Sequence, residues 1–62
     1  MAAARYDIRK THNEMWSVFD TQSGIAAALD GEYLIDMELE DADDLADLLN
    51  YLQAQREAAT LQ

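Results

Sequence analysis

YDIRKTHNEMWSVF, residues 6–19, is the stretch that decides the fold of this chain. Tyr6 and Ile8 alternate with charged residues, and Trp16 and Val18 recur at the same spacing after a polar interruption. An apolar residue at every second position is typical of a β-strand with one buried face. The stretch therefore predicts two strands that place four large apolar side chains on one face of a sheet.

The polar interruption, Thr11-His12-Asn13, predicts a tight hairpin between these strands. With Asn13 in the left-handed conformation, a three-residue loop would place Ile8 opposite Trp16. His12 beside Thr11 also has the composition of a base and a nucleophile. A solvated turn is the simpler interpretation, because histidine and asparagine tolerate turn geometry.

Asp30-Gly31 predicts a second hairpin, because a two-residue type I′ turn favours this dipeptide at two positions of positive φ. The turn would pair Ala28 with Tyr33 and Ala26 with Ile35. After the turn, apolar residues alternate with acidic ones on the far strand. The residues expected on its buried face are Tyr33, Ile35, Met37 and Leu39.

The last third of the chain predicts one helix over residues 41–59. Ala42, Leu45, Leu49 and Leu52 recur at helical spacing, and Asp41 is in the position of an N-cap before an acidic first turn. No proline or glycine follows Gly31, so nothing in the sequence ends the helix sharply.

These elements predict an α+β fold, an antiparallel β-meander of three or four strands over residues 5–39 with one C-terminal α-helix packed on one face. The length suits a single domain, residues 1–62, of which residues 1–4 are expected to be flexible. The expected core is Tyr6, Ile8, Trp16, Val18, Tyr33, Ile35, Met37, Ala42, Leu45, Leu49 and Leu52.

The charge of the chain is concentrated in its middle. The net charge is −9, yet nine carboxylates and no lysine or arginine lie in residues 30–47. Such a field repels nucleic acid and anionic membranes and attracts basic protein surfaces. We therefore expect a basic protein partner and no direct binding to nucleic acid or membrane. The expected docking surface is Asp36, Glu38, Glu40, Asp43, Asp44 and Asp47.

A second interpretation of these carboxylates stays open. Asp41, Asp43 and Asp44 lie where a helix N-terminus favours negative charge, and the acidic residues of the preceding strand would simply solvate one face. Paired carboxylates also serve acid–base or metal chemistry, but residues 41–44 lack the glycine of a calcium loop. We expect no catalytic residue, no metal site and no cofactor.

The proposed strands also predict an uncovered apolar face, because one helix covers only one side of a small sheet. The residues expected there are Met15, Phe19, Leu29 and Leu34. A homodimer or a protein partner would cover them. A different strand register, or residues 1–4 folded over this face, would explain them equally well.

The sequence resembles short, acidic, uncharacterised bacterial proteins. The resemblance spans residues 6–52 and depends on Trp16-x-Val18-Phe19-Asp20, on Gly24, on Asp30-Gly31 and on the run EDADDLADLLN, residues 40–50. It implies no activity and assigns no site residue. By charge and size alone the chain is also similar to phage-encoded inhibitors that mimic DNA.

The sequence thus predicts a noncatalytic interaction or regulatory module with an acidic docking surface. The absence of cysteine removes disulfides and thiolate metal sites. No segment has the length of a membrane span or the layout of a signal peptide, so a cytoplasmic location is expected. The alternatives are a DNA-mimic inhibitor of a nucleic-acid-binding protein, a carboxylate- or metal-dependent accessory enzyme, and a purely structural domain without a dedicated partner.

Overall fold

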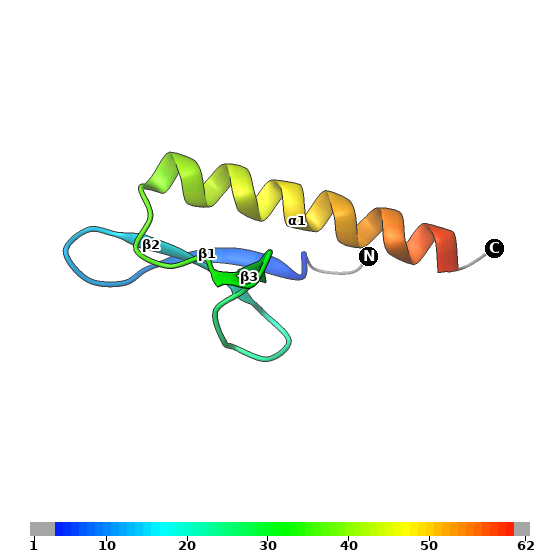
Figure 1. Cartoon of the computed structure of the whole chain (residues 1–62), viewed down its shortest axis with the longest axis horizontal. Coiled ribbons are helices and arrows are strands. Elements are labelled where there is room, and N and C mark those ends of the chain that lie inside the picture. Colours follow the sequence, from blue (N-terminus) through cyan, green and yellow to red (C-terminus); the bar gives the residue numbers. More distant parts are fainter. Residues whose placement is uncertain (1–3, 61–62) are drawn as a thin grey trace.

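Two small hairpins and one long helix make up the structure, a computed structural model that describes residues 4–60 (Figure 1). The elements are β1 (Tyr6–Lys10), β2 (Trp16–Asp20), β3 (Ala28–Leu29), β4 (Glu32–Tyr33) and α1 (Leu39–Thr60). The α+β class is confirmed, but the strands form two two-stranded sheets and not a meander of three or four. Of the expected flexible residues 1–4, residues 1–3 lie outside the described part.

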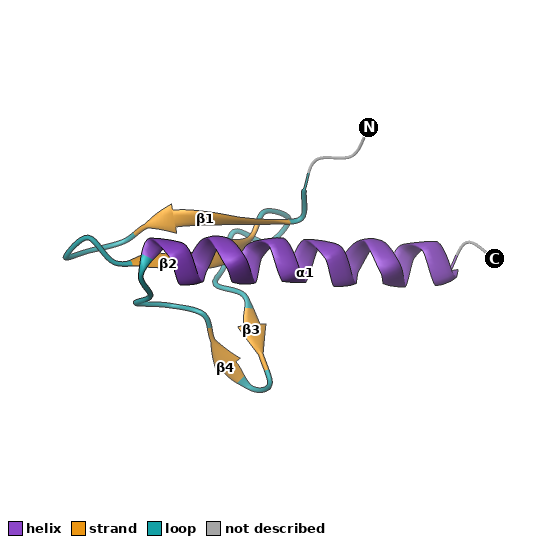
Figure 2. Ribbon diagram, turned by 90° about the horizontal axis from the view of Figure 1, so that it is seen from above, coloured by secondary structure: helices purple, strands orange, loops and turns teal. Residues whose placement is uncertain are grey.

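The helix lies along the first hairpin, and the second hairpin projects to one side of it. Figure 2 shows β1 on one flank of α1 and the β3–β4 hairpin on the other. The face of the β1–β2 sheet that carries Val18 therefore packs against α1, as the sequence predicts.

The register of the first hairpin differs from the prediction by two residues. Ile8 pairs with Val18, and Lys10 pairs with Trp16, because the loop extends over residues 11–15. Two successive residues in this loop have positive φ, Asn13 at 51° and Glu14 at 59°. The left-handed Asn13 is confirmed, and a shift of two residues leaves each side chain on its predicted face.

The free edge of β2 is bound by both arms of the second hairpin, which meet it around Val18. The Val18 N–H donates to the Leu34 carbonyl, and the Val18 carbonyl accepts from the Ala27 N–H, both at 2.9 Å. The Leu34 N–H in turn donates to the Ala27 carbonyl, also at 2.9 Å. Further along, Trp16 and Met37 exchange two backbone hydrogen bonds of 2.7 and 2.8 Å. The two arms thus meet β2 through isolated antiparallel bridges, Trp16 with Met37 and Phe19 with Ala26, while β3 and β4 form a separate sheet.

The turn of the second hairpin is confirmed, but the face that it buries is not the predicted one. Asp30 and Gly31 have φ of 53° and 83°, and Ala28 pairs with Tyr33 as expected. Because the arms straddle Val18, however, Leu34 enters the core while Tyr33 is 65% exposed. Ile35 is also exposed, so its predicted core position and that of Tyr33 are wrong.

The core forms where α1 crosses β2. Its fully buried members are Val18 and Ala42, and the other buried members are Ala27, Leu34, Ala46 and Leu49. Six partly buried apolar residues pack around them: Tyr6, Ile8, Trp16, Leu29, Met37 and Leu45. The small side chains of Ala42 and Ala46 allow the helix to approach the sheet closely.

The helix begins earlier than predicted, and the stripe that it turns toward the core differs from the predicted one at Leu52. It starts at Leu39, and the Ala42 N–H donates to the Glu38 carbonyl, so Asp41 lies inside the first turn and is not the N-cap. Ala46 replaces Leu52 in the buried stripe, and Leu52 is exposed.

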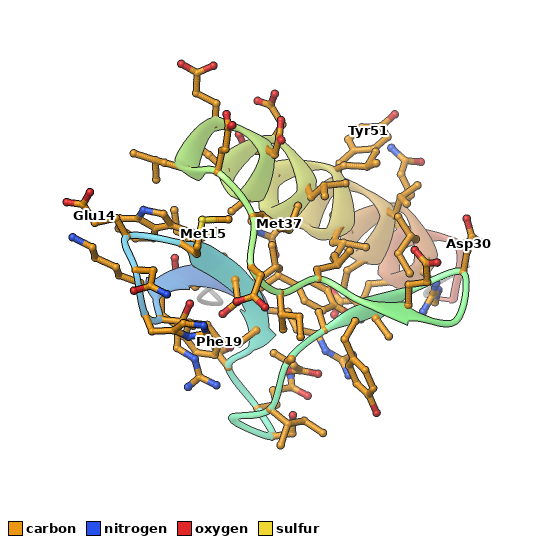
Figure 3. All side chains as sticks on the ribbon, turned by 60° about the vertical axis from the view of Figure 1, so that its left-hand side comes forward. Glu14, Met15, Phe19, Asp30, Met37 and Tyr51 are labelled. Atoms are coloured by element: carbon orange, nitrogen blue, oxygen red, sulfur yellow. The ribbon has the colours of Figure 1, made fainter. Side chains whose placement is uncertain are left out.

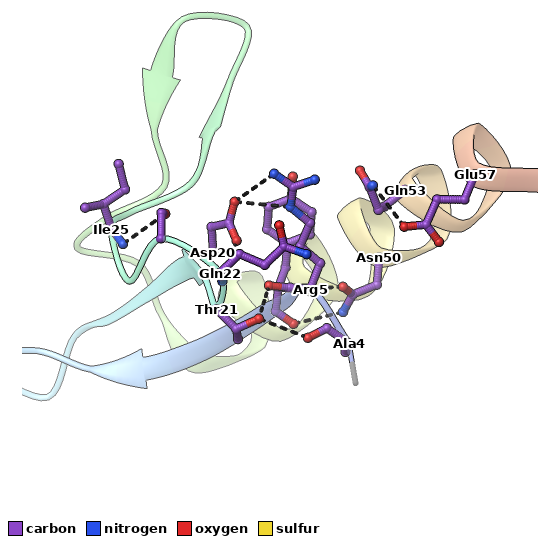
Figure 4. Close-up of polar contacts among 11 residues, drawn as sticks. Ala4, Arg5, Asp20, Thr21, Gln22, Ile25, Asn50, Gln53 and Glu57 are labelled. Carbon is purple, nitrogen blue, oxygen red and sulfur yellow. Dashed lines mark hydrogen bonds and ion pairs between the residues drawn. The ribbon is translucent and has the colours of Figure 1, made fainter. Parts of the chain in front are cut away.

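A side-chain amide holds α1 to the start of β1. The Tyr6 N–H donates to Asn50 Oδ1 at 2.8 Å, and Asn50 Nδ2 donates to the Tyr6 carbonyl at 2.9 Å (Figure 4). The Asn50 carboxamide thereby satisfies both backbone groups of Tyr6, as a neighbouring strand would.

Replacing Asn50 with alanine should therefore destabilise the fold. Loss of two partly buried hydrogen bonds leaves the Tyr6 backbone unsatisfied, and the expected loss in the free energy of unfolding is about 1–3 kcal/mol. Urea unfolding followed by circular dichroism measures it. Gln53→Ala is the matched control, because the Gln53 amide bonds only to the exposed Glu57 side chain. Equal stability of the two variants would contradict the proposed role of Asn50.

Candidate functional site

Four carboxylates of the expected docking surface lie on α1, on the side turned away from the core. Glu40, Asp44 and Asp47 follow the spacing i, i+4, i+7, and Asp43 lies beside them. All four are exposed, whereas Ala42, Ala46 and Leu49 follow the same spacing on the buried side. We call Glu40, Asp43, Asp44 and Asp47 the acidic helix face.

The two other expected residues, Asp36 and Glu38, lie in the segment between β4 and α1 and are exposed. Asp36 has a positive φ of 54°, and its Oδ1 lies 3.7 Å from Nε2 of His12 in the loop of the first hairpin. The docking residues therefore fall into two groups, one on the helix and one in the segment that leads to it.

In the part of the chain that the structure describes, the carboxylates of the acidic helix face belong to neither of the ion pairs, Arg5–Asp20 and His12–Asp36. Arg5 instead pairs with Asp20, 3.1 Å away, and the Arg9 guanidinium lies over the Phe19 ring on the first hairpin. The negative field of the helix therefore extends into solvent.

Helix capping explains only part of this acidity. Glu40 and Asp41 are the acidic residues of the first turn, where the helix dipole favours negative charge. Because the helix begins at Leu39, Asp43, Asp44 and Asp47 all lie beyond that turn, where the dipole effect has fallen off. Asp43 and Asp47 are also four residues apart, a spacing at which like charges repel. This repulsion between Asp43 and Asp47 lowers the free energy of unfolding.

An exposed apolar patch follows the acidic helix face along α1, and it includes Leu52, which the sequence placed in the core. It consists of Leu48, Tyr51 and Leu52, which are 44%, 61% and 42% exposed. In Figure 3 the Tyr51 ring points away from the sheet. The signal in the sequence was the pair Ala46 and Asn50, whose spacing from Ala42 marks the true inner stripe and leaves Leu52 outside it.

The four residues expected to form an uncovered face do not form one. Leu34 is buried in the core and Leu29 packs against it, so both belong to the helix side of the structure. Phe19 lies under the Arg9 guanidinium, 4.7 Å from the ring centroid, while Met15 is partly exposed at the end of the first loop (Figure 3). The inverted facing of the second hairpin is the reason that the set is divided.

The side chains with catalytic or metal-binding chemistry are dispersed. In the described part of the chain, no three histidine, aspartate or glutamate side chains are placed to hold a metal ion. His12 is exposed in its loop, with Asp36 as its acidic neighbour. Among residues 4–60, no helix has the length and apolar character to cross a membrane.

One ion pair fixes the end of β2 to the start of β1. Arg5 Nε and Nη2 donate to Asp20 Oδ2 at 3.2 and 3.1 Å, while the Gln22 N–H donates to Asp20 Oδ1 at 2.8 Å (Figure 4). The Gln22 N–H and the Arg5 guanidinium, in that order, lower the pKa of the Asp20 carboxyl. The same carboxylate raises the pKa of Arg5.

The lowered pKa of Asp20 predicts one component of acid unfolding. The stabilisation by Asp20 is complete above its unfolded-state pKa of about 3.9 and is lost as the pH falls through the lower native pKa. Asp20→Asn should therefore be less stable than the parent at neutral pH, and the difference should shrink below about pH 4. Urea midpoints across an acid series test this. A difference that stays constant with pH would contradict it.

The acidic helix face and the apolar patch are thus two surface features of α1 that packing within residues 4–60 does not explain. The chain has no match among protein-family models, curated proteins or solved structures.

Proposed function

We propose that this chain is a small noncatalytic interaction or regulatory module that docks through its acidic helix face against a basic surface of another protein. The observation that carries the proposal is the placement of Asp43, Asp44 and Asp47. They are exposed, they lie beyond the reach of helix capping, and no ion pair within residues 4–60 neutralises them.

A cation from a partner would offset the repulsion between the carboxylates of the acidic helix face. Like charges at spacings of three and four residues destabilise a helix by about 0.2–0.5 kcal/mol per pair. A basic partner would turn this repulsion into attraction and would speed association by electrostatic steering. Nucleic acid and anionic lipid would add further negative charge, which favours a protein partner.

A noncatalytic role is supported by the exposure of the titratable side chains. Acid–base catalysis by paired carboxylates depends on environments that differ between the two groups, and burial in a cleft usually creates that difference. The carboxylates of α1 are exposed to solvent along the helix. His12, in the loop of the first hairpin, and Asp36, in the segment between β4 and α1, are exposed as well.

Removing three charges from the acidic helix face should separate docking from stability. In the variant Asp43→Asn/Asp44→Asn/Asp47→Asn, relief of repulsion should raise the free energy of unfolding by about 0.5–1 kcal/mol. The same variant should lose the proteins that the parent captures from its host lysate at low salt. Mass spectrometry of the captured proteins, at low and high salt, is the measurement.

The matched control removes three charges elsewhere. Glu14→Gln/Asp30→Asn/Glu32→Gln changes the net charge equally but alters the two hairpin turns, and asparagine suits the positive φ of Asp30. This control should retain the captured proteins. If both variants lose them equally, or both keep them, the acidic helix face is not the docking surface. Nucleic-acid-binding proteins among those captured would indicate the DNA-mimic form of the proposal.

A further inference from the structure

We infer that the partner presents a basic amphipathic helix, whose apolar stripe packs on the apolar patch Leu48, Tyr51 and Leu52 of α1. Its lysine or arginine residues then pair with the acidic helix face. This inference rests on the proposed function and specifies the partner that the docking surface fits.

The apolar patch has the geometry of a helix-packing surface. Leu48, Tyr51 and Leu52 follow the spacing i, i+3, i+4, so their side chains are neighbours on one side of the helix. Each is more than two-fifths exposed, and packing against the core accounts for none of them. Side chains in such rows interdigitate with those of a second helix.

The acids lie directly beside this patch. Asp44 precedes Leu48 by four residues, and Asp47 precedes Tyr51 by four, so each carboxylate lies one turn away from an apolar side chain on the same side of α1. A ligand that covers the patch therefore meets two carboxylates at its edge. Apolar contact and positive charge are required of the same ligand, and a basic amphipathic segment supplies both.

A helix suits this surface better than a strand does. The backbone groups of α1 at these positions are bonded within the helix, so an extended peptide would find no open edge there. Side chains alone must supply the contact, and interdigitating rows on two helices are the usual way in which they do so.

Charge disfavours a second copy of this chain as the occupant. The chain has thirteen aspartate and glutamate residues and four lysine and arginine residues. A second copy would bring its own acidic helix face to the contact and would leave both faces without enough cations. A partner with the opposite charge removes this conflict.

The experiment uses a synthetic helical peptide as the probe. Its leucines recur at i, i+3, i+4 and i+7, and its flanks are lysine and arginine. Two control peptides accompany it: one has the same composition with the leucines scattered around the helix, and one has glutamate in place of each basic residue. Fluorescence anisotropy measures their binding to the full chain at low and high salt.

Three variants locate the contact. Leu48→Ser and Leu52→Ser should each weaken binding of the basic amphipathic peptide by about tenfold. Ile25→Ser is the matched control, because Ile25 is 63% exposed in the loop after β2, which lies on the side of the sheet opposite α1 (Figure 1). This control should bind like the parent. Circular dichroism verifies folding, and Tyr51→Ser replaces a leucine variant that fails to fold.

The outcomes separate this inference from the proposed function. If the scattered-leucine peptide binds as tightly as the amphipathic one, and the leucine variants bind like the parent, the inference is wrong while charge-based docking stands. If the glutamate peptide binds as tightly as the basic one, the acidic docking surface itself is wrong. If sedimentation shows a dimer that Leu52→Ser dissociates, the occupant is a second copy and the inference is overturned.

Discussion

The rest of the structure depends on the backbone of Val18. A two-stranded hairpin is only marginally stable in water, and this chain has two of them. Val18 joins the hairpins, since its N–H and carbonyl bind Leu34 and Ala27 on the two arms of the second, while its side chain is fully buried under α1. One residue thus connects both sheets and the helix. The core around it is small, as expected for a chain of 62 residues.

The local features of the fold were predictable from the sequence, and the non-local ones were not. Asp30-Gly31 predicts its turn because few dipeptides adopt two positive φ values, and the helical spacing of apolar residues in the last third of the chain predicts a helix. The facing of the second hairpin depends instead on how its arms meet β2. In an extended strand Tyr33 and Ile35 lie on one face and Leu34 lies on the other. All three are apolar, so the sequence pattern allows either face to be the buried one. The backbone contacts of these arms with β2, at Val18 and at Trp16, select Leu34.

The candidate site shows the same division. The acidity of residues 36–47 was evident from composition, but which acids cap the helix depended on its first residue. A start at Leu39 moves Asp43 and Asp44 out of the first turn and weakens capping as their explanation. The sequence did not place Leu52 in the apolar patch, because Leu52 and Ala46 both fit a helical stripe and the more hydrophobic leucine was expected in the core. Close approach of the helix to β2 favours alanine.

The two hydrogen bonds between the Asn50 side chain and the Tyr6 backbone have a consequence for aggregation. Opposed residues of an antiparallel pair direct their backbone groups alternately toward and away from each other. The backbone N–H and carbonyl of Val18 point toward the second hairpin and away from β1. The backbone groups of Ile8, which pairs with Val18, and of Tyr6 therefore point toward the open edge of β1. Asn50 occupies both groups of Tyr6, and the Asp7 carboxylate accepts from the Ile8 N–H at 2.8 Å. An incoming strand would find this edge already occupied at its start, so edge-to-edge polymerisation of the folded protein is blocked there.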